Sequence, residues 1–189
     1  MTNNRDVWFI SDTHFGHKNI ISYCRPQFAG IDEMEAAIIY RWNQTIKPHD
    51  LVYHLGDFAW TARDAIRVRQ FLNGTIRLIV GNHDDIPSLA AAGLFQKIEL
   101  WRQFREHGFT ASHIPLRSDQ LRHGKANLHG HVHGAVEGLE PFHRDVSCES
   151  IDFRPVHLED VAAWATNVNQ QVEANETAAI RAAKEATDV

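Results

Sequence analysis

The chain has 189 residues, of which 43% are hydrophobic, and a formal net charge of -5. This length fits one domain with a full hydrophobic core, and the negative charge disfavours stable binding to nucleic acid, which selects a basic surface. Two cysteines are too few for a disulfide scaffold. The first residues lack the apolar stretch of a signal peptide, and no apolar run reaches the ~18 residues of a membrane span, so we expect a cytoplasmic protein without a membrane anchor. The thirteen histidines are unusual, because histidine is the commonest metal ligand.

The first half of the sequence alternates between strand and helix patterns. Three short apolar runs predict buried strands at residues 6–10, 51–55 and 76–80. Apolar residues at helical spacing predict a helix that begins at Asp32, and Thr61 is a suitable N-cap for a second helix. A short alanine-rich helix follows the third strand and ends at Gly93. This order predicts a parallel sheet with helices on its faces.

The second half contains short strand candidates with few helices between them, at residues 98–101, 109–112, 126–128 and 146–147. We therefore expect a second, more antiparallel sheet, and an α/β fold of two packed mixed β-sheets flanked by helices. A final helix begins at Leu158 and becomes polar and alanine-rich beyond Asn167. We accordingly divide the chain into a domain of residues 1–166 and a C-terminal helical tail of residues 167–189, which projects or frays.

Side chains that bind metals follow each of the first three predicted strands. Asp12 and His14 come after the first strand, Asp57 after the second, and Asn82 after the third. Because the carboxyl ends of parallel strands meet at one edge of a sheet, we expect these groups to converge. Asp12 and His14 are two positions apart, so their side chains point to the same side of an extended chain.

Three histidines in the second half extend this set of candidate ligands. His113 follows another strand candidate, and His131 and His133 are two positions apart between Gly130 and Gly134. The glycines allow the backbone to turn tightly close to an ion. Nitrogen and oxygen donors without cysteine suit divalent ions such as Mn, Fe, Co, Ni or Zn.

These donors suffice for two ions if Asp57 bridges them. Two divalent ions carry about four positive charges, of which the carboxylates of Asp12 and Asp57 and a bridging hydroxide offset about three. The remaining charge suits an anionic phosphate, and metal-bound water can have a pKa of roughly 7. We therefore predict two divalent metal ions as cofactors, with Mn favoured, and a phosphate ester as the substrate.

The set of motifs resembles that of the calcineurin-like metallophosphoesterases, in particular small bacterial or phage phosphoesterases. The blocks, in the family's order, are Asp12-Thr13-His14, Gly56-Asp57, Gly81-Asn82-His83-Asp84, His113 and Gly130-His131-Val132-His133. The resemblance implies a two-sheet sandwich flanked by helices. It also implies that one ion binds Asp12, His14, Asp57 and His133, and that the other binds Asp57, Asn82, His113 and His131. His83 would face the phosphate and the leaving-group oxygen, so the implied catalytic residues are His83 and Asp57.

Other residues have competing interpretations. His17 either faces the same pocket and binds substrate or makes a loop hydrogen bond. Arg25 either binds a phosphate oxygen or belongs to a structured loop. His54 lies inside a predicted strand and reads as a core histidine. Phe58 and Trp60 either stack on a nucleobase or aryl group or pack in the ordinary way.

The predicted reaction is hydrolysis of a phosphate ester by a metal-bridging hydroxide, with His83 as general acid. The chain has no large insertion between its motifs that would build a lid, so we expect an open site and small phosphodiester substrates. One alternative is a non-catalytic metal-binding scaffold for protein interactions on the same fold, which would be expected to lose His83 or several ligands. Another is a nuclease, which the negative net charge disfavours.

Overall fold

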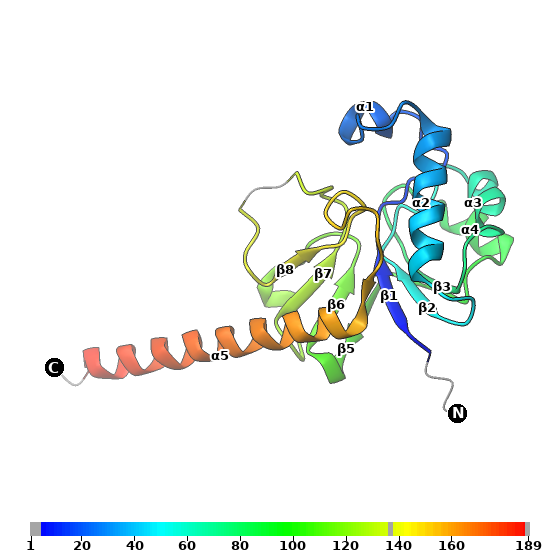
Figure 1. Cartoon of the computed structure of the whole chain (residues 1–189). Helices are drawn as coiled ribbons and strands as arrows, with labels where there is room; N and C mark the ends of the chain where they lie inside the picture. Colours follow the sequence, from blue (N-terminus) through cyan, green and yellow to red (C-terminus); the bar gives the residue numbers. More distant parts are fainter. Residues whose placement is uncertain (1–4, 136–137, 188–189) are drawn as a thin grey trace.

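The computed structural model of the chain describes residues 5–135 and 138–187 and contains two packed β-sheets (Figure 1). The first sheet has the strand order β4-β3-β2-β1-β9. Its strands are β1 (Val7–Ile10), β2 (Leu51–His54), β3 (Thr75–Ile79), β4 (Lys97–Glu99) and β9 (Val156–His157). Strands β1 to β4 are parallel, and β9 is antiparallel to β1. The three predicted strands of the first half and their parallel pairing are confirmed.

Four helices belong to the first half of the chain: α1 (Ile20–Cys24), α2 (Ile31–Thr45), α3 (Ala62–Arg69) and α4 (Ile86–Ala92). Helices α2, α3 and α4 lie on one face of the first sheet (Figure 1). Thr61 caps α3 as predicted, because its side chain accepts a hydrogen bond from the backbone N–H of Asp64. Helix α4 ends at Gly93, which has a φ of 64°, a conformation that favours glycine.

Both faces of the first sheet are buried, which explains why its strands are apolar runs rather than alternating patterns. Ile10 of β1 packs with Met34 and Trp42 of α2 on the helical side. The preceding residue, Phe9, points to the other side and packs against Phe109 of the second sheet. The hydrophobic core therefore has two layers, one between helices and sheet and one between the two sheets.

The second sheet has the strand order β5-β6-β7-β8. Its strands are β5 (Trp101–Phe104), β6 (Phe109–Ser112), β7 (Ala126–His129) and β8 (His143–Asp145). The expectation of a more antiparallel sheet is wrong, because β6-β7 and β7-β8 are both parallel and only β5-β6 is antiparallel. Parallel neighbours need a crossover of about a dozen residues. The first crossover, residues 113–125, is a loop with one turn of 3-10 helix at Ser118–Gln120, and the described residues of the second, 130–135 and 138–142, contain no helix.

Two strand assignments in the second half differ from the sequence-based prediction. The run 98–101 is divided at Leu100, so that β4 ends in the first sheet and β5 begins in the second. The segment 146–147 is not a strand, because β8 ends before it and Ser147 forms only an isolated bridge with Ser11. The prediction of two mixed sheets flanked by helices is nevertheless confirmed.

The last helix, α5 (Leu158–Thr187), runs along the second sheet and then projects away from the body (Figure 1). Its packed part reaches the buried Val168 and Asn169, whose side-chain amide donates a 2.9 Å hydrogen bond to the carbonyl oxygen of Gly108. From 173 to 185 every side chain is exposed. The projecting part therefore has little contact with the two sheets.

The division predicted between residues 166 and 167 falls within α5, which continues through it without a break. The packing contacts of the helix extend past this position to Asn169. The boundary stays a prediction, and a truncation that tests it should begin beyond these contacts. Within residues 5–135 and 138–187, no helix combines the length and apolar character of a membrane span.

Candidate metal centre

The loops that follow five strands bring all seven predicted ligand side chains together. They come after β1 (Asp12, His14), β2 (Asp57), β3 (Asn82), β6 (His113) and β7 (His131, His133). Because β1, β2, β3 and the strands β6 and β7 end at the same edge of the sandwich, residues far apart in sequence become neighbours. The expected convergence at the carboxyl ends of the strands is what the structure contains.

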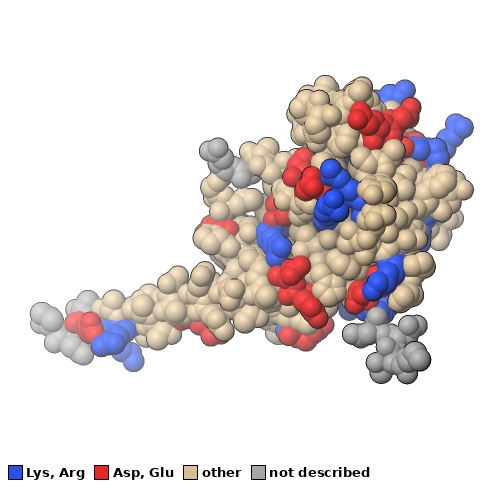
Figure 2. Space-filling view, viewed as in Figure 1, with Lys and Arg blue, Asp and Glu red and all other residues tan. Residues whose placement is uncertain are grey.

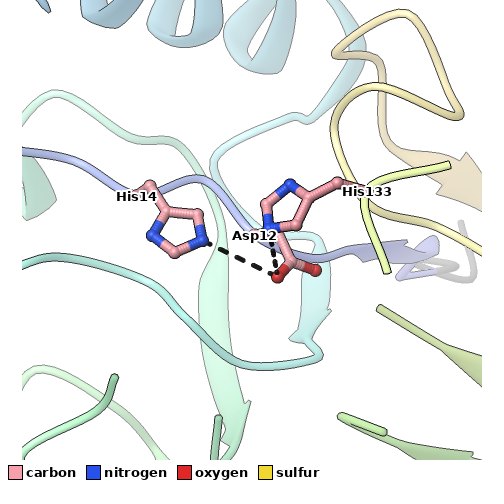
Figure 3. A group of neighbouring side chains, drawn as sticks. All are labelled: Asp12, His14 and His133. Carbon is pink, nitrogen blue, oxygen red and sulfur yellow. Dashed lines mark ion pairs between the residues drawn. The ribbon is translucent and has the colours of Figure 1, made fainter. Parts of the chain in front are cut away.

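Asp12, His14 and His133 form one group of donors (Figure 3). Oδ1 of Asp12 lies 3.8 Å from Nε2 of His14 and 3.5 Å from Nε2 of His133. Figure 3 shows both rings aiming a nitrogen at this carboxylate. Such separations are longer than typical hydrogen bonds but suit ligands arranged around one ion.

Asp57, His113 and His131 form the second group. Nε2 of His113 lies 3.5 Å from Oδ2 of Asp57 and 2.9 Å from Oδ1 of Asn82, which adds the amide oxygen to this group. The same oxygen of Asp57 lies 3.6 Å from Nε2 of His14 in the first group. A single carboxylate oxygen therefore faces both groups of donors.

The backbone at the ligands is held in a conformation that side chains rarely adopt. Five of these residues have φ angles between 51° and 71°: Asp12, His14, Asp57, His131 and His133. Non-glycine residues in this region cluster at functional sites, where the surrounding structure holds them in place. Two glycines permit the close approach of the loops, since a Cβ on Gly81 would overlap Asp57 and one on Gly130 would overlap Asp12.

Backbone hydrogen bonds orient the two carboxylates. Oδ2 of Asp12 accepts from the N–H of His131 at 2.9 Å, and Oδ1 of Asp57 accepts from the N–H of His83 at 2.8 Å. Each carboxylate thereby keeps its other oxygen directed at the neighbouring imidazoles. Asp84 fixes the same loops from beneath, because its carboxylate accepts from three backbone N–H groups, including those of Asp57 and Gly81.

The unsatisfied atoms of the centre fit a metal ion. Oδ1 of Asp12 and Nε2 of His14 are buried and have no hydrogen-bond partner among the described residues. Buried polar atoms are normally paired, so two such atoms 3.8 Å apart suit a cation that both could bind. In His113, Nδ1 lies 2.8 Å from the carbonyl oxygen of Leu55 and would donate to it, which leaves the lone pair on Nε2 for a metal.

The electrostatics of His14 and His131 are consistent with this fit, whereas His133 has to lose a proton before it binds an ion, because contacts with Cys24, Glu149 and Asp12 outweigh burial and raise its pKa to about 10. Burial lowers the pKa of His14 to about 2, and the charge of Arg25 adds to the effect. Burial also lowers the pKa of His131. Both rings are therefore neutral near pH 7, the form in which imidazole binds metals. Burial raises the pKa of Asp12 to about 6, although nearby histidines oppose it, and a bound cation would favour its carboxylate form.

Comparison with known proteins agrees with this geometry. The family model described as calcineurin-like phosphoesterase matches residues 6–173. The chain belongs to this family. Membership supports metal-dependent hydrolysis of phosphate esters, and the clustered ligands supply candidate metal sites for it.

Similar proteins come from an archaeon, a phage and a bacterium. An uncharacterized protein of Methanocaldococcus jannaschii is 35% identical over 164 residues, which cover 82% of this phosphoesterase and 88% of the relative. The gene 66 protein of Mycobacterium phage L5 is 25% identical over 87% of this chain and 90% of its own. The crystal structure of a protein of unknown function from Aquifex aeolicus matches with a TM-score of 0.69 and 28% identity, covering 84% of this chain and 98% of that one. This last match supports the two-sheet fold.

One residue at the phosphoesterase centre has no motif in the sequence. Oε2 of Glu149 lies 3.0 Å from Nδ1 of His133, on the side of the ring opposite to Asp12. Burial opposes ionisation of Glu149, but contacts with His133 and Arg25 outweigh it and lower its pKa to about 2. A carboxylate behind a metal-binding histidine orients the ring and strengthens it as a ligand. Only the tertiary structure joins Glu149 to His133.

Arg25 is fully buried behind the first metal-binding loop. Its Nε donates to Oε1 of Glu149 at 2.6 Å, and its guanidinium also donates to the backbone carbonyl oxygens of Asp12 and Thr13. These contacts favour the structured-loop interpretation over direct contact with a phosphate. Arg25 therefore holds the loop that carries Asp12, and we propose a positioning role for it in place of substrate binding.

A cavity of about 520 Å³ opens over both groups of ligands. His83 is exposed at its wall, where its ring lies 5.5 Å from that of His14. His17 also lines it, with Nδ1 3.2 Å from Nδ1 of His14 and its ring stacked on Trp60 at 4.1 Å. Trp60 and Tyr23, 48% and 70% exposed, form an aromatic rim. His54, in contrast, is fully buried, with Nε2 2.9 Å from the hydroxyl of Thr13, as expected of a core histidine.

Proposed function

We propose that this phosphoesterase hydrolyses small phosphodiesters at a centre of two divalent ions that share Asp57, with His83 as general acid. The observation that carries the proposal is the position of Oδ2 of Asp57, 3.6 Å from Nε2 of His14 and 3.5 Å from Nε2 of His113. A carboxylate oxygen that faces two separate groups of donors is what a bridging ligand requires.

The two proposed ligand sets follow the two groups of donors. They are Asp12, His14, Asp57 and His133 for one ion, and Asp57, Asn82, His113 and His131 for the other. When bound, divalent ions such as Mn supply Lewis acidity and lower the pKa of coordinated water. The chain itself positions the ligands through the backbone hydrogen bonds to Asp12 and Asp57.

The composition of the cavity supports a diester substrate. Among the described residues that line it, none is Lys or Arg, so neither of these side chains is available for a second phosphate charge. A phosphomonoester carries about -1.5 to -2 charges at pH 7, whereas a diester carries about one. The rim of Trp60 and Tyr23 supports an organic group on the ester, because aromatic rings stack on planar rings. His17, which stacks on Trp60, is the proposed substrate contact on this side.

His83 is proposed as the proton donor because of where its backbone and ring lie. Its N–H is bonded to Asp57, which fixes the residue at the centre without using the imidazole. The ring faces the cavity beside His14 and His17. A general acid has to lie within hydrogen-bond reach of the leaving oxygen, and an exposed ring at the cavity wall satisfies this need.

A substrate panel tests the proposal. Protein stripped with a chelator and reconstituted with Mn would be assayed on bis(p-nitrophenyl) phosphate, p-nitrophenyl phosphate, cyclic nucleotides and a single-stranded oligonucleotide at one salt concentration. We expect higher kcat/KM for small diesters than for the monoester, and no activity in Asp57→Ala, which controls for contaminating phosphatases. Inactivity on every ester would favour the non-catalytic scaffold. A preference for the oligonucleotide would favour a nuclease.

The distribution of surface charge is relevant to the last outcome. On the face that Figure 2 shows, Lys and Arg side chains are interspersed with Asp and Glu rather than gathered in a basic stripe. Tight binding to a nucleic-acid backbone depends on several clustered cations. This face therefore favours small substrates.

A further inference from the structure

Behind His133 lies a group of three donors that the two-metal centre does not use: Cys24, Glu149 and Nδ1 of His133. Sγ of Cys24 is 3.2 Å from Oε1 of Glu149 and 3.8 Å from Nδ1 of His133. Oε2 of Glu149 is 3.0 Å from the same Nδ1, and it is buried with no aligned hydrogen-bond partner among the described residues. The sulfur thus contacts one oxygen of the carboxylate and Nδ1 contacts the other, and one donor atom from each of the three residues lies within 4.8 Å of the other two.

We propose that Cys24, Glu149 and Nδ1 of His133 form a third cation site, selective for a thiophilic divalent ion such as Zn²⁺. Tetrahedral zinc, with bonds of about 2.3 Å to sulfur and 2.0–2.2 Å to nitrogen or oxygen, places sulfur about 3.6 Å from either atom and nitrogen about 3.4 Å from oxygen. The 3.8 Å from sulfur to Nδ1 and the 3.0 Å from Nδ1 to Oε2 differ from these values by less than about half an ångström, as does the 3.2 Å from sulfur to the other carboxylate oxygen, Oε1. Thiolate ligation selects zinc over manganese or magnesium, which prefer oxygen donors.

The surroundings of this outer site suit the charge of a bound cation and give the cation a route from the cavity. The carboxylate of Glu149, which pairs with Arg25 and His133, offsets part of the charge of the ion, and binding releases the thiol proton of Cys24 and the Nδ1 proton of His133 to solvent. Cys24 and His133 both line the cavity over the main centre, so an ion can enter from it and a water can complete the coordination. Arg25, bonded to Oε1 of Glu149, keeps that carboxylate in place.

The outer site and the main centre compete for the imidazole of His133. His133 directs Nε2 at Asp12, as Figure 3 shows, and its Nδ1 lies 3.0 Å from Oε2 of Glu149. A neutral imidazole has one lone pair, so an ion at Nδ1 leaves the proton on Nε2 and withdraws this ligand from the ion beside Asp12. Zinc at the outer site should therefore inhibit the Mn-loaded enzyme. This antagonism rests on the proposed function, whereas the existence of the outer site does not.

Spectroscopy tests the site independently of activity. The chain has two cysteines, so a thiolate-to-metal charge-transfer band must come from Cys24 or Cys148. Reduced, Mn-loaded protein would be titrated with Cd²⁺, a spectroscopic substitute for Zn²⁺. We expect a near-ultraviolet band in the unmodified protein and in Cys148→Ala, whose thiol is fully buried, and no band in Cys24→Ala or Cys24→Ser. No band in the unmodified protein, or a band that survives in both Cys24 variants, would overturn the proposal.

Inhibition tests the antagonism. Each variant would be assayed with Mn and increasing Zn²⁺, and its rate divided by its own rate without zinc. We expect the Zn²⁺ concentration for half-inhibition to rise at least about tenfold in Cys24→Ala, since loss of a supporting group costs a metal site about 10–100-fold in affinity. Equal inhibition of both proteins, with the Cd²⁺ band confirmed, would refute the antagonism and leave the two-metal mechanism standing. Inactivity without zinc would count against the proposed function instead.

Discussion

Glu149→Gln separates the support of the metal centre from the centre itself. The substitution keeps the shape of the side chain but removes its charge, 3.0 Å from Nδ1 of His133 and 2.6 Å from Nε of Arg25. The ring of His133 then loses the carboxylate that orients Nε2 toward Asp12. Loss of such a partner typically lowers metal affinity about 10–100-fold, or about 1.4–2.8 kcal/mol.

The same substitution should also destabilise the metal-free fold. Arg25 is fully buried, and removal of one partner of a buried ion pair costs about 3–5 kcal/mol. We expect the lower end, about 3 kcal/mol, because the guanidinium keeps its hydrogen bonds to the carbonyl oxygens of Asp12 and Thr13. The loss of stability and the loss of affinity arise from the same carboxylate but are measured separately.

Two measurements check these values. Titration calorimetry with Mn²⁺ reports affinity, and urea unfolding of the metal-free protein reports stability. Glu159→Gln is the matched control, because this side chain is 90% exposed and should change neither quantity appreciably. If Glu149→Gln bound two Mn²⁺ ions as tightly as the unmodified protein does, Glu149 would not support His133. If the stability were unchanged, the buried ion pair with Arg25 would contribute nothing net.

Four further outcomes follow from the structure. His83→Ala should retain both metals but lose about 10²–10⁴-fold in turnover of alkyl or nucleoside esters. Its loss with p-nitrophenyl esters should be smaller, because their good leaving group needs less protonation. His131→Ala should instead lose metal and slow both kinds of substrate alike. Elemental analysis of Mn-loaded protein should find two ions per chain, and Asp57→Ala should lose more metal than any single histidine variant, because Oδ2 faces both groups. Removal of residues 178–189 should leave turnover nearly unchanged, since the side chains of residues 178–185 are exposed, and a folded but inactive truncation would show that the tail is needed. Burial lowers the pKa of His54 from 6.5 to about 3, so below pH 6.5 this residue binds a proton in the unfolded chain but not in the folded chain. The free energy of unfolding should therefore fall by up to about 1.4 kcal/mol for each pH unit by which the pH is lowered. In urea unfolding between about pH 7 and pH 5, His54→Asn should reduce the dependence of the free energy of unfolding on pH. An unchanged dependence would contradict this role of His54.

Local patterns in the sequence were sufficient to locate the ligand-bearing loops. Apolar runs mark β1, β2 and β3, and Asp12, His14 and Asp57 come directly after them. The parallel arrangement of these strands follows from the helices between them, so the alternation of strands and helices was enough to predict that the strand ends converge. His131 and His133 were recognisable from another local pattern, because they are two positions apart between two glycines.

The arrangement of the second sheet depended on contacts that local patterns do not encode. Long loops without much helix can return a chain to the starting side as well as a helix can, so the second sheet is less antiparallel than its short strands and turns indicate. The continuous apolar run 98–101 gave no sign that the chain changes sheets at Leu100. Such choices are made by the packing of one sheet on the other.

The support of the centre is likewise a property of the tertiary structure. Arg25 and Glu149 are 124 positions apart, and their pairing exists because α1 and the segment after β8 meet behind His133. A buried guanidinium needs acceptors from every side, and only the folded chain determines whether these are protein carbonyl oxygens or a substrate phosphate. The sequence by itself therefore determined which side chains are candidate ligands and which loops carry them. The tertiary structure decided which side chains hold those ligands in place, because buried charges are paired across long sequence separations.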